Sequence, residues 1–98
     1  MKRLALVLAL LGLAASATAA DVLRGADLYQ RHCANCHGGS GRPVMPTAPD
    51  FARPGALLRP DPQLLDAIRT GRGAMPAYQG VLRDREILDI VAHLRTLR

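Results

Sequence analysis

The segment Cys33-Ala34-Asn35-Cys36-His37 constrains the fold of this 98-residue chain more than any other segment does. Two thiols separated by two residues and followed directly by a histidine form the attachment signature of a c-type haem. In that chemistry the two sulfurs add across the two vinyl groups on one edge of a porphyrin. The next residue then lies under the iron, where an imidazole nitrogen can bind it. The motif therefore predicts that Cys33 and Cys36 hold one covalent haem c and that His37 is an axial ligand of its iron.

Three other interpretations of the cysteine pair stay open from the residues alone. A redox dithiol is expected within alternating strands and helices, and the sequence shows no such alternation. A structural zinc site needs about four ligands, whereas the chain has two cysteines and three histidines. A disulfide across two residues would close a small, strained loop and would leave His37 without a role.

The first twenty residues have the order that is typical of a secretory signal peptide. A basic start precedes an apolar run over residues 4–13, and small residues follow. Cleavage after Ala19 or after Ala20 fits this order, and an uncleaved anchor is the alternative. The apolar run is shorter than the about 20 residues of a membrane span. We therefore expect residues 1–20 to be a signal peptide, and residues 21–98 to be one periplasmic domain without stable membrane insertion.

The charge of the domain gives little information about its partners. Removal of residues 1–20 lowers the net charge of the chain from +5 to +3, because two basic residues leave. The basic residues that remain are all arginines, and they are scattered, which does not indicate nucleic-acid binding. A local arginine-lined face near the haem edge would attract an acidic partner.

The core of so small a domain is limited, and the sequence offers few aromatic side chains to fill it. The chain contains one phenylalanine, two tyrosines and no tryptophan. We therefore expect the haem to supply much of the core. The chain without haem should be mostly unfolded.

Helical periodicity marks both ends of the domain. Residues 21–33 form the first predicted helix, with Asp21 as a suitable N-cap. Gly25 costs about 1 kcal/mol in a helix relative to alanine, and a close crossing with a second helix would explain it. Tyr29 lies on the same face. The last helix is expected over residues 84–97, with an apolar stripe at three- and four-residue steps formed by Ile87, Ile90, Val91, Leu94 and Leu97.

The middle of the chain combines one further helix with an irregular loop. The helix is predicted to begin at Asp61 as N-cap, with Pro62 in its first turn, and to end at Gly71. The proline-rich residues 44–60 show little periodicity, so we expect an ordered loop around the haem. The apolar side chains of this loop that we expect to cover the ring are Val44, Phe51, Leu57 and Leu58.

One methionine follows the middle helix in a turn between glycines. A thioether is a soft ligand that suits a low-spin haem iron, so Met75 is the predicted sixth ligand. Met45 is a rival within reach of His37, but no regular element fixes its position. An open iron site or a second histidine ligand are the remaining alternatives. The context of the other two histidines, His32 and His93, does not favour a ligand role.

On these residues the chain resembles a small bacterial class I cytochrome c over most of the region 21–98. The resemblance implies an all-α, cytochrome c-like fold of about three to four helices wrapped around one covalent haem. It also implies that Pro49 offers its carbonyl to the imidazole N–H of His37, which would orient the ring and raise its basicity. The residues that carry the resemblance, apart from the stripe of the last helix, are Gly25, Tyr29, Cys33, Cys36, His37, Gly38, Pro49, Met75 and Pro76.

Three features depart from the family pattern. His93 occupies a position where the last helix commonly carries an aromatic residue, so the helix crossing should be less well packed, or His93 should meet a propionate or solvent. Arg83 stands where a serine or threonine usually caps that helix, which should then begin at Asp84. Because there is no tryptophan to bond a propionate, arginines or backbone amides must do so.

The function that the resemblance implies is single-electron transfer. An iron with both axial positions filled cannot readily bind substrate, so we expect no catalytic residues and an electron carrier rather than an enzyme. Its redox protein partners would meet the exposed haem edge through a small, short-lived interface. The alternatives are an electron-transfer subunit of a periplasmic dehydrogenase or oxidase complex and, less favoured, an open-site haem enzyme or gas sensor. The protein would thus be a monomer or a subunit of an enzyme complex.

Overall fold

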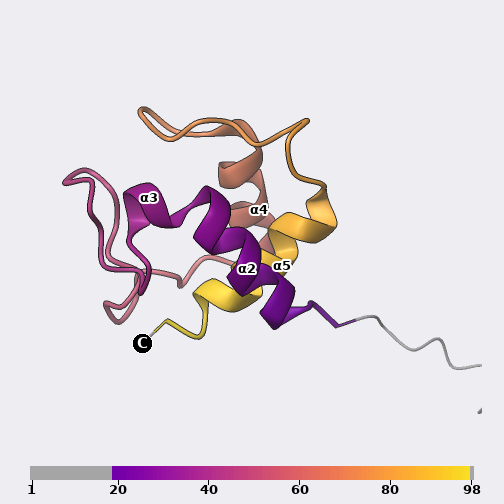
Figure 1. The fold of residues 1–98 in the computed structure, drawn as a ribbon, viewed down its shortest axis with the longest axis horizontal. Coiled ribbons are helices and arrows are strands. Elements are labelled where there is room, and N and C mark those ends of the chain that lie inside the picture. Colours follow the sequence, from indigo (N-terminus) through magenta and orange to yellow (C-terminus); the bar gives the residue numbers. More distant parts are fainter. Residues whose placement is uncertain (1–18, 98) are drawn as a thin grey trace, which may run out of the picture.

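The computed structural model describes residues 19–97, which form four α-helices and no β-strand. The helices are α2 (Val22–His32), α3 (Ala34–His37), α4 (Asp61–Thr70) and α5 (Asp84–Leu94) (Figure 1). The all-α architecture predicted from the sequence is confirmed. The predicted signal peptide lies outside the described residues except for its last two positions. No helix within residues 19–97 is both long and apolar enough to span a membrane.

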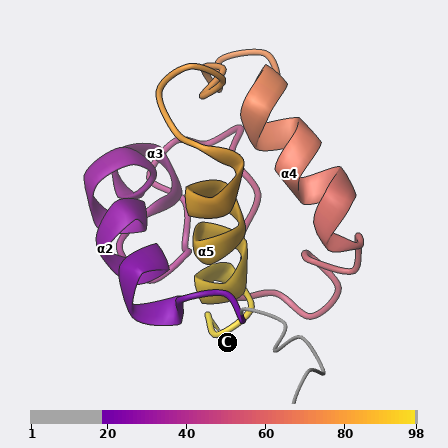
Figure 2. The same ribbon diagram turned by 90° about the vertical axis from the view of Figure 1, so that its right-hand side faces the viewer.

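Helices α2 and α5, from the two ends of the domain, cross and pack against each other. Figure 2 shows α5 in the centre, with α2 on one side and α4 on the other. A Cβ atom added to Gly25 would overlap the backbone carbonyl of Asp89, so the predicted close approach is confirmed. The core formed around this crossing consists of Leu28, Tyr29, Ile68, Leu82, Ile87, Ile90, Val91 and Leu94.

The start of α2 is fixed both within the helix and to α5. The carboxylate of Asp21 accepts a hydrogen bond of 2.9 Å from the backbone N–H of Arg24, as expected of an N-cap. The backbone N–H of Asp21 donates to Asp89 Oδ1 at 2.8 Å. Asp89 is 1% exposed, so this contact gives a buried carboxylate on α5 a hydrogen-bond donor.

The ends of α4 and α5 differ slightly from the predicted positions. The N-cap of α4 is Pro60 rather than Asp61, and no side chain caps the helix. It ends as predicted at Gly71, which has a φ of 75°. Helix α5 begins at Asp84, as expected, and the carboxylate of Glu86 accepts a hydrogen bond of 3.0 Å from the backbone N–H of Arg83.

The last helix is shorter than its apolar stripe. Helix α5 ends at Leu94, and Arg95 is its C-cap. Leu97, which the sequence placed on the helix, still packs against the core from the turn that follows. The stripe therefore identified the buried residues correctly although the helical backbone stops earlier.

The segment after α4 turns back onto that helix. Arg72 and Met75 exchange two backbone hydrogen bonds of 3.1 and 2.8 Å. The backbone N–H of Tyr78 then donates to the carbonyl of Ile68 on α4 at 3.1 Å. The backbone around Met75 is therefore tied to the C-terminal half of α4.

Candidate functional site

A cavity of about 600 Å³ is lined by residues of all four helices and of the two long loops. Its volume is in the range of small-molecule and cofactor sites, roughly 300–1,000 Å³. The cavity lining includes all five residues that the sequence singled out for the cofactor, namely Cys33, Cys36, His37, Pro49 and Met75. The fold thus brings these residues to one place, and their individual roles stay predictions.

The imidazole of His37 is buried against this cavity at the end of α3. The residue is 8% exposed, and its Nδ1 atom is buried without a hydrogen-bond partner among the described residues. The ring of Phe51 stacks on it, with 4.6 Å between centroids and 22° between planes. Burial lowers the pKa of His37, which favours the neutral imidazole that binds metals. Pro49 lines the same cavity, but the predicted hydrogen bond from His37 to its carbonyl is not formed here.

The two cysteines do not have the environment of a redox dithiol or of a zinc site. Burial and, to a smaller extent, the neighbouring Cys36 raise the pKa of the Cys33 thiol to about 11, whereas a reactive dithiol needs a lowered pKa. Within residues 19–97, no three histidine, cysteine, aspartate or glutamate side chains lie close enough together to hold a metal ion. The cavity volume, the two thiols and the buried imidazole instead fit one covalently attached haem.

Two tyrosines hold the attachment segment at both of its ends. The hydroxyl of Tyr29, on α2, donates to the carbonyl of Gly38 at 2.5 Å. The hydroxyl of Tyr78 donates to the carbonyl of His32 at 2.8 Å. Burial raises the pKa of Tyr29 to about 12, so it stays a hydroxyl donor at neutral pH. The role of Tyr78 could not be predicted from the sequence, because its acceptor is a backbone carbonyl 46 residues away.

Both candidate methionines line the cavity, but different parts of the fold hold them. Met75 packs against the hydrophobic core and belongs to the segment tied to α4. The backbone N–H of Met45 donates to the carbonyl of Cys36 at 3.0 Å, which places Met45 beside α3.

Two of the four loop residues expected to cover the haem point elsewhere. Phe51 and Leu57 line the cavity, as predicted. The prediction was wrong for Val44 and Leu58, which are 70% and 85% exposed and do not line it. Adjacent residues of an irregular segment face different sides, so Leu57 turns inward and Leu58 turns outward.

His93 packs into the helix crossing instead of approaching the cavity. Its ring lies 5.1 Å from that of Tyr29, with an angle of 55° between the planes. His93 does not line the cavity, so the structure does not support the expected contact with a propionate. Its Nε2 atom is buried without a hydrogen-bond partner in the described structure, which makes it an imperfect replacement for an aromatic ring.

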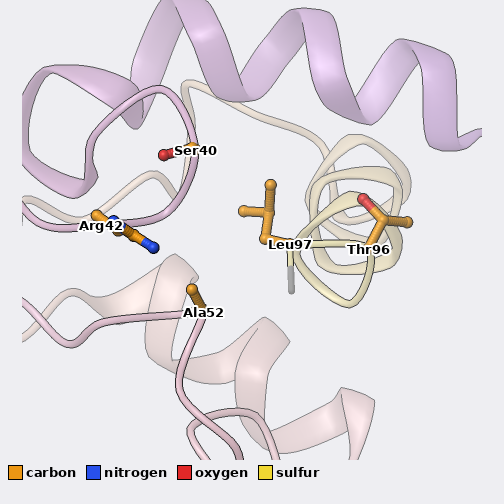
Figure 3. Close-up of a pocket in the computed structure, with 5 residues that line it drawn as sticks. All are labelled: Ser40, Arg42, Ala52, Thr96 and Leu97. Atoms are coloured by element: carbon orange, nitrogen blue, oxygen red, sulfur yellow. The ribbon is translucent and has the colours of Figure 1, made fainter.

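A second, smaller pocket of about 310 Å³ lies between the loop after α3 and the end of α5 (Figure 3). Its lining consists of Ser40, Arg42, Ala52, Thr96 and Leu97. None of the predicted haem residues is among them. The larger cavity is therefore the candidate cofactor site.

Known proteins are similar to this chain in sequence and in fold. Residues 20–94 match the family model described as cytochrome c oxidase, cbb3-type, subunit III. The cytochrome c6 of Thermosynechococcus vestitus is 34% identical over 89 residues, covering 87% of this chain and 78% of the relative. The cytochrome c6 of Thermostichus vulcanus is 34% identical over 83 residues, covering 81% and 72%. The solved c-type cytochrome KustC0563 aligns with a TM-score of 0.70 at 26% identity, covering 76% of this chain and 96% of that one.

These similarities agree with the geometry of the cavity. The family and its relatives imply one covalently bound haem c per chain and electron transfer rather than enzymatic catalysis. The helical architecture agrees with that of a solved c-type cytochrome. The chain therefore belongs to the class I c-type cytochromes, as a small member with a single haem.

Proposed function

We propose that this cytochrome is a periplasmic single-electron carrier whose haem iron is bound axially by His37 and Met75. The observation that carries the proposal is that these two residues line one cavity from different parts of the fold. His37 ends α3, which packs on α2, whereas Met75 belongs to the segment tied to α4. Two axial ligands approach the iron from opposite faces of the porphyrin, so ligands held by separate elements suit this geometry.

Met45 is less suited to the sixth position than Met75. Its backbone is bonded to the carbonyl of Cys36, directly before His37 in the sequence. Met45 thus lies on the side of the cavity that already supplies the histidine.

The bound haem supplies one-electron chemistry through the Fe(II)/Fe(III) couple, and a His/Met ligand set raises its potential. The chain's own residues position and shield the iron. Stacking by Phe51 limits rotation of the His37 ring. Pro49 lines the same cavity, and a hydrogen bond from the His37 Nδ1–H to its carbonyl would satisfy that buried atom.

Periplasmic location is supported by two features of the sequence. Residues 1–20 have the order of a signal peptide. Covalent haem attachment through cysteine thiols is expected outside the bacterial cytoplasm, in agreement with export. Sequencing the N-terminus of the exported protein would test cleavage, and a terminus at Ala20 or Asp21 is expected.

The ligand assignment is tested by visible spectra of the purified holoprotein with and without carbon monoxide. Wild type should show a low-spin reduced haem that does not bind carbon monoxide. Met75→Ala should become high-spin and bind it, while the matched variant Met45→Ala should behave as wild type. If Met45→Ala opens the iron instead, the assignment is wrong. Carbon monoxide binding by wild type would indicate an open-site haem enzyme or gas sensor.

A second candidate function is an electron-transfer subunit of a larger periplasmic redox enzyme. The match to a family model described as an oxidase subunit favours it. Affinity purification from periplasmic extracts at low protein concentration distinguishes the free carrier from the enzyme subunit. Stoichiometric recovery of a larger enzyme would support the subunit, and recovery as a free monomer would support the carrier.

A further inference from the structure

Asp89 is a buried carboxylate without a positively charged partner in the described part of the chain. The residue lies on α5 and is 1% exposed. The acidic residues within 19–97 that form ion pairs with arginines are Asp27, Asp50, Asp61, Asp84 and Glu86. Aspartate is seldom fully buried unless it is paired, because moving an isolated charge out of water is costly. A counter-ion for Asp89 must therefore come from another group of the chain.

The hydrogen-bond donor to Asp89 is the backbone nitrogen of Asp21. This nitrogen lies 2.8 Å from Asp89 Oδ1, and the contact is partly buried. The same nitrogen belongs to the peptide bond between Ala20 and Asp21, which is one of the two cleavage positions expected for the signal peptide. One atom of a candidate cleavage site is thus in direct contact with the buried carboxylate.

Hydrolysis of this bond changes the charge of that nitrogen. A signal peptidase adds water as the C–N bond breaks. The oxygen of water goes to Ala20 as part of a new carboxylate, and its two hydrogens go to the nitrogen of Asp21, which becomes an α-ammonium group. Both residues are exposed, so the bond is accessible. The contact of 2.8 Å has the length of a charge-assisted bond, about 2.7–2.9 Å, so the ion pair needs no movement of α5.

Cleavage one residue earlier has a different result. It places the ammonium group on Ala20 and leaves the nitrogen of Asp21 as an uncharged amide. Consecutive α-carbons are about 3.8 Å apart, and Ala20 is exposed. The positive charge would then lie farther along an exposed segment. Only cleavage after Ala20 gives the hydrogen bond to Asp89 a charged donor.

We propose that the signal peptide is removed after Ala20 and that the new α-ammonium group of Asp21 is the counter-ion of Asp89. This ion pair joins the first residue of the mature chain to the last helix, where Gly25 also lies against the backbone of Asp89. Export thereby completes the contact between α2 and α5. Both statements rest on the proposed signal peptide, and neither depends on ligation of the iron by Met75.

N-terminal sequencing of the exported holoprotein tests the position of the cut. A terminus at Asp21 is expected. A terminus at Ala20 would overturn the proposal and leave export intact, whereas a terminus at Met1 would overturn the signal peptide as well. Carbon monoxide binding reports on the axial ligands separately.

The charge of the pair can be removed without any substitution. Residues 21–98 contain no lysine, so the α-amine is the only primary amine of the mature protein. Acetylation removes its positive charge but keeps an N–H donor, whereas reductive dimethylation keeps both the charge and a donor. The acetylated holoprotein should unfold with an equilibrium constant about tenfold above that of the dimethylated form, because hydrogen bonds between charged groups are the stronger ones. Equal stability of the two forms would overturn the proposal.

Asp89→Asn tests the acceptor. Asparagine keeps an oxygen for the hydrogen bond but has no negative charge, so the acetylated and dimethylated forms of this variant should be equally stable. Asp66→Asn is the matched control, because Asp66 is an exposed residue of α4, and its two forms should differ as those of wild type do. A difference that persists in Asp89→Asn would overturn the role of Asp89. If Asp89→Asn does not accumulate, the two modified forms of wild type still decide the question.

The rate of acetylation gives an independent readout. Only the unprotonated amine reacts, and a neighbouring carboxylate keeps the amine protonated. The α-amine of wild type and of Asp66→Asn should therefore react several times more slowly than that of Asp89→Asn. Equal rates in all three proteins would contradict the ion pair.

Discussion

The α-carbon of Gly25 lies against the backbone carbonyl of Asp89, where α2 crosses α5. A Cβ atom at this position would overlap that carbonyl and come within 2.9 Å of the backbone nitrogen of Ile90. Both neighbours are backbone atoms, so no side-chain rotation can relieve the contact. The crossing closes the fold by joining the first and the last helix of the domain.

Gly25→Ala should therefore destabilise the protein even though alanine is the better helix former. The gain in helix propensity is about 1 kcal/mol, and overpacking costs about 1–3 kcal/mol. Because the overlap is with backbone atoms, the cost lies at the upper end of that range, and we expect the free energy of unfolding of the holoprotein, measured with guanidinium chloride, to fall by about 2 kcal/mol. Gly39→Ala is the control, because the nearest atom to its Cβ would be Gln30 Oε1 at 3.7 Å. Equal stability of the two variants would contradict the close crossing.

Tyr29→Phe should weaken the attachment segment more than Tyr78→Phe does. Tyr29 is completely buried, and its hydroxyl donates a hydrogen bond to the carbonyl of Gly38. Loss of the hydroxyl leaves this buried acceptor unpaired, at a cost of about 1–3 kcal/mol in the free energy of unfolding. The bond from Tyr78 to His32 is only partly buried, and water can replace it. Thermal unfolding of both holoproteins measures the difference. The idea fails if Tyr78→Phe has the larger effect.

His93 should make the protein less stable as the pH falls. Burial lowers the pKa of His93 from its ordinary value of 6.5, so the unfolded chain binds the proton more readily than the folded protein does. The contribution of the neutral His93 imidazole to folding stability is complete at pH values above the pKa that His93 has in the unfolded chain. This contribution is lost as the pH falls below that pKa. His93→Phe should keep the packing on Tyr29 and remove the unpaired Nε2 atom.

Unfolding free energies at pH 7, 6 and 5 test this expectation. His93→Phe should be more stable than wild type by about 1 kcal/mol at neutral pH, and its stability should decline less toward pH 5. His93→Gln provides the control, since it cannot titrate but still places polar atoms in the crossing. It should lose the pH dependence without the gain in stability. If the unfolding free energy of both variants falls with pH as steeply as that of wild type, the pH dependence belongs to another group.

Removal of the haem should abolish cooperative folding. Without the cofactor, the cavity of about 600 Å³ lacks the group that fills it, and its apolar lining is exposed to water. The total stability of a domain is only about 5–15 kcal/mol, so a small domain is sensitive to this loss. The double variant Cys33→Ala, Cys36→Ala should therefore show no cooperative transition in far-UV circular dichroism. A sharp thermal transition in this variant would show that the helices are stable without the cofactor.

Features that depend on neighbouring residues were predictable from the sequence. The cap at Asp21, the end of α4 at Gly71 and the apolar stripe of α5 follow from hydrogen bonds and periodicity within a few residues. The attachment residues Cys33, Cys36 and His37 lie within five consecutive residues, so the backbone itself keeps them together. The glycine at position 25 also predicted the close approach between α2 and α5, because a crossing helix explains a residue that has a cost within the helix.

The tertiary structure alone decided how the cavity wall is built. Residues 44–60 have no periodicity, so the sequence did not show that Leu57 turns inward and Leu58 outward. Asp61 has the composition of an N-cap, yet it is the first residue of α4 and its carboxylate binds Arg95. The other partners of Arg95 are backbone carbonyls 36 and 38 residues away. Every residue has a carbonyl, so such contacts leave no complementary side chain in the sequence, and only the packing of α5 against α4 brings them within reach of one guanidinium.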